Sequence, residues 1–92
     1  MDKLDTLQQL FVIMMEECGE LIQQCSKCLR RLDYNWVHSV TQDNREKLVE
    51  EVGDVYAMIE LMHEFDLISW SEIEKRAEVK REKLKKWSDL VT

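Results

Sequence analysis

Hydrophobic and polar positions follow a helical period over three stretches of the chain. In the first, apolar residues alternate steps of four and three, which predicts one helix over Thr6–Leu32. The second predicts a helix over about residues 44–65, and the third a helix from near Ser69 to near the C-terminus. The stripes consist of Leu7, Phe11, Met14, Cys18, Leu21, Cys25, Cys28 and Leu32; of Leu48, Val52, Val55, Ile59 and Met62; and of Ile73, Ala77, Leu84, Trp87 and Val91.

Each predicted helix begins at residues that accept hydrogen bonds from free backbone amides. Thr6 is the expected N-cap of the first helix, and Asp5 before it suits the positive end of the helix dipole. Residues 43–46 and 69–72 have the capping-box pattern, with Asp or Ser followed three residues later by Glu. Residues 33–42 lose the period and form a connection. We expect an all-α fold, with residues 1–92 forming a single domain built as an antiparallel bundle of three main helices.

Composition adds an expectation of self-association. The chain has 92 residues, no proline, two glycines and 35% charged residues, which suits long amphipathic helices. A helical domain of this size buries only a limited core by itself. We therefore expect oligomerisation to complete the bundle, with a homodimer as the smallest assembly.

Charge and hydropathy narrow the classes of partner. A net charge of −6 argues against a scaffold held to nucleic acid by phosphate contacts, and it permits cation binding. The sequence has no run of about 18 apolar residues and no leader with a small-residue cleavage site. We expect a soluble, cytoplasmic protein whose partners include neither nucleic acid nor a membrane.

The three cysteines, Cys18, Cys25 and Cys28, lie in one predicted helix, a poor geometry for a disulfide framework. Reduced thiols fit better. Cys25-x-x-Cys28 is open to a zinc or redox interpretation, but zinc needs four ligands and no second Cys or His pair with ligand spacing is nearby. Core packing is the favoured interpretation.

Two acidic blocks, residues 16–20 and 50–54, share the pattern Glu-Glu-x-Gly-(Glu or Asp) on separate helices. The second and fifth residues of each block are three apart, so their carboxylates project together. If the two helices pair with the blocks facing, four carboxylates converge, and their repulsion must be relieved by protons or by cations. Carboxylate oxygens favour hard divalent ions such as Mg²⁺. The four residues are Glu17, Glu20, Glu51 and Asp54.

The alternative interpretation of these blocks is a pair of solvated helix faces with ion pairs four residues apart. No basic residue stands four positions after any acidic residue of either block, so that pattern is absent. Gly19 and Gly53 add to the case, because a glycine inside a helix costs about 1 kcal/mol relative to alanine. We expect a close backbone approach or space for a ligand there.

Glu-Glu-x-x-Glu followed by Glu-Glu-Val-Gly-Asp on the next helix resembles the MazG-like family of all-α nucleoside triphosphate pyrophosphohydrolases, over most of the chain. The resemblance implies that Glu17, Glu20, Glu51 and Asp54 bind Mg²⁺, with Mn²⁺ as a substitute. It implies hydrolysis of a nucleoside triphosphate, or of a deoxynucleotide in a house-cleaning or phage-type enzyme, to a monophosphate and pyrophosphate, by metal-activated water attacking the α-phosphate. It also implies a homotetramer built from dimers.

Further roles come with this resemblance. The family commonly has a basic pair in the following helix that contacts phosphates, and Lys80 and Lys83 stand there, with Arg76 as a further candidate. Lys80 belongs to the third apolar stripe, so a lysine that extends its ammonium group from an apolar face is the alternative. Glu16 or Glu50 would orient the attacking water or support the metal ligands.

Base recognition has two candidate regions. Trp36 and His38, with Tyr34, offer aromatic rings in the connection, although a loop that caps the bundle core would look the same. Met58 lies beside the second acidic block on an apolar surface, which fits a nucleobase pocket or a subunit interface.

Two other classes of function remain open. The first is a non-catalytic helical module whose apolar stripes mediate oligomerisation. The second is a metal-binding bundle with redox or storage chemistry, against which stands the absence of histidine beside the acidic blocks.

Overall fold

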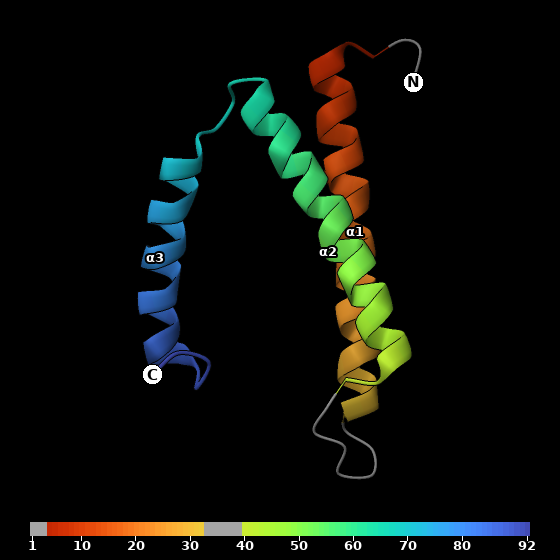
Figure 1. The fold of residues 1–92 in the computed structure, drawn as a ribbon, viewed down its shortest axis with the longest axis vertical. Coiled ribbons are helices and arrows are strands. Elements are labelled where there is room, and N and C mark those ends of the chain that lie inside the picture. Colours follow the sequence, from red (N-terminus) through yellow and green to blue (C-terminus); the bar gives the residue numbers. More distant parts are fainter. Residues whose placement is uncertain (1–3, 33–39) are drawn as a thin grey trace. The chain divides into compact units, whose positions relative to one another are not determined.

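The computed structural model describes residues 4–32 and 40–92, and these form three helices without any β-strand. They are α1 (Thr6–Leu32), α2 (Gln42–Glu64) and α3 (Trp70–Trp87) (Figure 1). The predicted all-α class is confirmed, and the bounds of α1 agree with its apolar stripe.

The first residues of α1 and α2 correct two of the predicted caps. Asp5, not Thr6, caps α1: its carboxylate accepts from the amide of Gln8 at 2.8 Å, and its own amide donates to the Gln8 side chain at 3.0 Å. This reciprocal pair gives partners to the backbone amides of Asp5 and Gln8. Thr6 lies inside the helix and therefore cannot act as its N-cap. The second helix begins two residues earlier than expected, because Thr41 accepts from the amide of Asn44 at 3.3 Å in place of a box at residues 43–46.

The predicted cap of α3 is confirmed. Ser69 has extended backbone angles, and its hydroxyl accepts from the amide of Glu72 at 3.3 Å while donating to the Glu72 carboxylate at 2.8 Å. The preceding break is a Schellman ending of α2, with Asp66 in the left-handed region (φ 58°) and the amide of Leu67 donating to the carbonyl of Met62 at 3.0 Å. Aspartate tolerates this conformation, so the chain needs no glycine there.

The chain divides into two compact units, residues 1–61 and residues 62–92. In the first unit α1 and α2 lie side by side and run antiparallel (Figure 1). Their buried residues are two apolar and two polar side chains: Leu10, Met58, Gln24 and Glu51. The three-helix bundle stays a prediction, since α1 and most of α2 belong to one unit, whereas the end of α2 and all of α3 belong to the other.

The hairpin seam follows the predicted apolar stripes in part, because most of their residues on α1 and α2 are half-buried. Three large apolar residues of these two stripes are exposed, by 44% at Leu7, 49% at Phe11 and 48% at Val52. The buried residues of α1 are Leu10 and Gln24, which stand beside the stripe. Of the cysteines, Cys18 and Cys28 are half-buried but Cys25 is exposed, so the core-packing interpretation is wrong for Cys25; all three are free thiols.

In the second unit, no residue of α3 is buried. The rings of His63 and Trp70 stack across the break, with centroids 5.3 Å apart. Among the described residues, neither this unit nor the first has a helix long and apolar enough to cross a bilayer.

Candidate metal centre

Four carboxylates meet in the middle of the α1–α2 hairpin. Glu17 and Glu20 come from α1, Glu51 and Asp54 come from α2, and one oxygen of each lies within 4.8 Å of one oxygen of every other. The two acidic blocks therefore face each other, as their spacing predicted. The structure brings the whole predicted ligand set together.

Glu51 is the most enclosed member of this cluster. Its side chain is 5% exposed, and its Oε2 atom is buried without a hydrogen-bond partner among the described residues. The same holds for Oε2 of Glu17 on the facing helix. A buried carboxylate oxygen without a donor is costly unless a cation or proton completes its surroundings. These two oxygens would be satisfied by a cation or a proton between the helices.

Mutual repulsion is visible in the acid–base behaviour of the cluster. Partial burial raises the pKa of Glu17, and the charges of Asp54, Glu51 and Glu16 raise it further. The pKa of Glu20 is also raised, first by a hydrogen bond to Glu51, which requires a proton between the two carboxyl groups, and then by the charges of Glu17, Glu51 and Asp54. Binding of a proton or a cation would relieve this repulsion.

One basic side chain partly offsets this charge. The ammonium group of Lys47 lies 3.2 Å from Oε1 of Glu51 and 3.3 Å from Oε2 of Glu50. The expected absence of ion pairs four residues apart is therefore wrong for Glu51, whose partner stands four positions before it. Hydrogen bonds to these two carboxylates raise the pKa of Lys47. Lys47 leaves the second oxygen of Glu51 unsatisfied. One ammonium group is therefore insufficient for four carboxylates, and the composition of the site, oxygen ligands only, fits a hard divalent cation such as Mg²⁺, Mn²⁺ or Ca²⁺.

A polar contact fixes the register that aligns the acidic residues. Gln24 is 2% exposed, and its side-chain amide donates to the backbone carbonyl of Asn44 at 3.1 Å, with Oδ1 of Asn44 at 3.4 Å and Sγ of Cys28 at 3.6 Å. The bond ties the C-terminal half of α1 to the first turn of α2. Sequence reasoning missed Gln24, because a single glutamine beside an apolar stripe carries no signal of burial.

Beside the carboxylates, the hairpin forms a mostly polar cavity of about 240 Å³. Glu20 and Glu51 bound it on the side of the cluster, and Lys27 and Lys47 bring positive charge to it. Gln23 and Gln24 complete the lining. The cavity gives the candidate metal centre an adjoining space for a polar, negatively charged ligand.

The other predicted site residues of the first unit lie at the edge of the cluster, in the core between the helices, or outside the described residues. Glu16 and Glu50 are exposed at the edge of the cluster, and Glu50 pairs with Lys47. Met58 is 7% exposed, so it serves as part of the small core between the helices. Trp36 and His38 lie outside the described residues.

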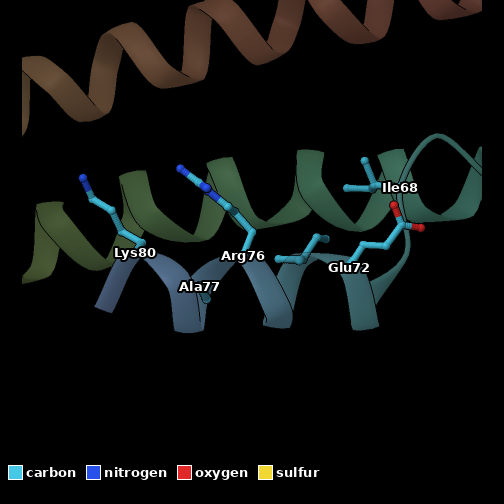
Figure 2. A pocket seen from close by; sticks show the side chains of 6 residues that line it. Ile68, Glu72, Arg76, Ala77 and Lys80 are labelled. Carbon is cyan, nitrogen blue, oxygen red and sulfur yellow. The ribbon is translucent and has the colours of Figure 1, made fainter. Parts of the chain in front are cut away.

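The three predicted phosphate-binding residues lie in the second unit and do not share one hollow. Arg76 and Lys80 line an apolar groove of about 520 Å³ with Glu72, as Figure 2 shows; its apolar lining is Ile68, Ile73 and Ala77. Lys83 lines a different hollow of about 340 Å³. The lining supports the view of Lys80 as a lysine that extends from an apolar face.

Neither glycine of the acidic blocks is required by a close approach within the described residues. A Cβ atom added at Gly19 or Gly53 would meet nothing within 4 Å. Among the described residues, the expectation of a close backbone approach is therefore wrong. The other expectation, space for a ligand beside the blocks, agrees with the open surroundings of both glycines.

The open space permits a stability prediction. Gly53→Ala is expected to raise the free energy of unfolding by about 1 kcal/mol, because alanine loses less backbone entropy in a helix. Urea unfolding followed by circular dichroism measures this change. If the glycine instead keeps room for a ligand, binding of that ligand falls in the stabilised variant. A lower stability would contradict the open space at Gly53.

Comparison of the chain with known protein families, with curated protein sequences and with solved structures found no match.

Proposed function

We propose that this protein is a Mg²⁺-dependent nucleoside triphosphate pyrophosphohydrolase. The observation that supports it best is the convergence of Glu17, Glu20, Glu51 and Asp54, with partnerless oxygens on Glu17 and Glu51. The MazG-like pattern of the two acidic blocks adds the reaction class. An oxygen-only site beside a polar cavity suits an ion that also binds phosphate oxygens.

The residues of the chain have distinct tasks in this proposal. The four carboxylates hold Mg²⁺, whose chemistry is to neutralise charge on phosphate oxygens and to activate water. Glu51 is buried where α1 and α2 pack together, so its side chain has little freedom and its carboxylate stays in the cluster. Lys47 holds one oxygen of Glu51 in place from the side of the cavity. Glu16 and Glu50, which are exposed, are the residues proposed to orient the attacking water or to support the metal ligands.

Self-association is part of the same proposal. In the described residues the only buried apolar side chains are Leu10 and Met58, whereas Phe11, Ile22 and Tyr56 are among the large apolar residues left 49, 70 and 52% exposed. So many exposed apolar side chains on the hairpin favour burial against another copy. Light scattering after size-exclusion chromatography is expected to give a dimer or tetramer, and an 11.1 kDa species would contradict this.

The same exposed apolar side chains support a second candidate, a helical interaction module without catalysis. The two candidates differ in their need for the buried carboxylates. A module has no use for Glu51 in its seam, where a leucine would stabilise the hairpin better. The enzyme requires it.

Pyrophosphate release tests the proposed function. The full chain is incubated with each common ribonucleoside and deoxyribonucleoside triphosphate, with Mg²⁺ and with EDTA, and pyrophosphate and orthophosphate are quantified separately. We expect pyrophosphate and a nucleoside monophosphate in equal amounts, only with the metal. Release of orthophosphate alone would contradict cleavage between the α- and β-phosphates. No release from any nucleotide by the folded protein would favour the interaction module.

A further inference from the structure

A basic cluster lies at one end of the hairpin groove that holds the carboxylates. Lys27, Arg30 and Arg31 of α1, with Asn44 of α2, line a hollow of about 250 Å³. The three basic side chains are exposed, and no carboxylate of the described residues lies within ion-pair distance of them. In a chain with a net charge of −6, such a cluster is a local excess of positive charge.

This hollow adjoins the cavity beside the candidate metal centre. Lys27 lines both of them. Lys27 and Arg31 lie within about 20° of Glu20 around the axis of α1, and side chains of an α-helix lean toward its N-terminus, which here is toward Glu20. The order along the groove is therefore the carboxylates, then Lys27, then the two arginines with Asn44.

The helix dipole explains part of the cluster but not all of it. Arg30 and Arg31 stand in the last turn of α1, where positive charge is favourable. Lys27 precedes that turn, and Asn44 belongs to the other helix. Oδ1 of Asn44 faces the amide of Gln24 at 3.4 Å, which leaves the Asn44 amide group as a donor. Guanidinium forks together with an ammonium and an amide donor match phosphate oxygens.

We propose that Lys27, Arg30 and Arg31 bind the terminal phosphates of the substrate, the part released as pyrophosphate. This inference rests on the proposed function. The polyphosphate tail runs from the four carboxylates along the groove toward the C-terminal end of α1, and the nucleoside extends the other way. The basic residues of α3 are then not required for the tail. The local positive charge of Lys27, Arg30 and Arg31 also explains how an acidic protein attracts a highly anionic substrate to this groove.

Charge removal in the groove tests the proposal. The double variant Lys27→Gln, Arg31→Gln is compared with Lys75→Gln, Lys86→Gln, which removes the same charge from exposed positions of α3. Isothermal titration with inorganic tripolyphosphate and Mg²⁺ measures binding without hydrolysis. We expect the groove variant to bind tripolyphosphate at least about tenfold more weakly, because two charge-assisted hydrogen bonds are lost. The control is expected to bind as the natural chain does.

Nucleotides of different length separate tail binding from general charge. The groove variant is expected to raise KM for the best nucleoside triphosphate about tenfold while leaving the Kd of its monophosphate unchanged, since a monophosphate has no tail. Equal weakening of both nucleotides would overturn the proposal, as would unchanged tripolyphosphate binding. So would a loss confined to the variant Lys80→Gln, Lys83→Gln.

The two proposals can fail separately. If the natural chain releases no pyrophosphate from any nucleotide, the proposed function fails. The tail site fails as well if the natural chain does not bind tripolyphosphate, or if the groove variant binds it with the same affinity as the natural chain. If the natural chain is active and the groove variant matches it in KM, the tail site alone fails.

Discussion

Glu51→Gln is expected to abolish pyrophosphate release, with a fall in kcat/KM of about a thousandfold or more. The substitution keeps the shape of the side chain but removes the charge from the most enclosed carboxylate of the cluster, which is 4% exposed. A neutral amide is a poor Mg²⁺ ligand, and each 1.36 kcal/mol of lost transition-state stabilisation costs about tenfold in rate. Pyrophosphate release at saturating Mg²⁺ measures the effect.

Glu60→Gln is the matched control for this experiment. It makes the same chemical change in the same helix at an exposed position outside the acidic block. It is expected to keep the activity of the natural chain. Circular dichroism should show that the Glu51 variant is folded, because glutamine relieves repulsion within the cluster. A folded Glu51 variant with natural activity would remove Glu51 from the proposed site.

Helical periodicity predicts the elements of this fold well and its tertiary contacts poorly. The range of α1 follows from apolar residues alone, and Ser69 at the start of α3 follows from its capping box. Asp5 was missed as the cap of α1 because two adjacent residues can both cap, and the partner at Gln8 decides between them. The stripe could not show which face packs, since Leu7 within it is 44% exposed, whereas Leu10 outside it is buried.

The carboxylate cluster could be predicted because two identical patterns on two helices carry their own geometry. Residues three apart share a helix face, and pairing two such faces brings four oxygens together. The surroundings of the cluster were predicted less well. Lys47 stands four residues before Glu51, a spacing at which helix side chains meet, and it was missed because only the positions after the acidic residues were compared. In the sequence, Lys27 and Arg31 indicate only a helix that ends with basic residues. The hollow that they line also requires Asn44 of the other helix, and its position depends on how α1 and α2 pack.

The burial of Glu51 links stability to the proposed chemistry. A carboxylate in a seam with only two buried apolar residues weakens a hairpin that has little core to compensate. Such a position is expected where a site requires it. The cost should therefore depend on pH and on Mg²⁺, and both dependences can be measured on the natural chain.

Without divalent cations, the melting temperature is expected to fall as pH rises above 4.5, the ordinary pKa of the glutamates concerned. The pKa values of Glu17 and Glu20 are raised in the folded chain. The folded state therefore binds more protons than the unfolded state above pH 4.5, and stability falls with pH until both groups are ionised in the folded state. The raised pKa of Lys47 acts only in the alkaline range and leaves this window unaffected.

Mg²⁺ should reverse this loss, and more strongly at neutral pH than near pH 4.5, because protons and the cation compete for the same carboxylates. At about 100 times its Kd, Mg²⁺ contributes about 2.7 kcal/mol to stability, which raises the melting temperature of a domain of this size by about 10 °C or more. Differential scanning calorimetry in EDTA and in Mg²⁺ measures both effects. The variant Glu17→Gln, Glu20→Gln is expected to lose the pH slope and most of the Mg²⁺ response. An equal Mg²⁺ response at both pH values, or in the variant, would show that the cation binds elsewhere.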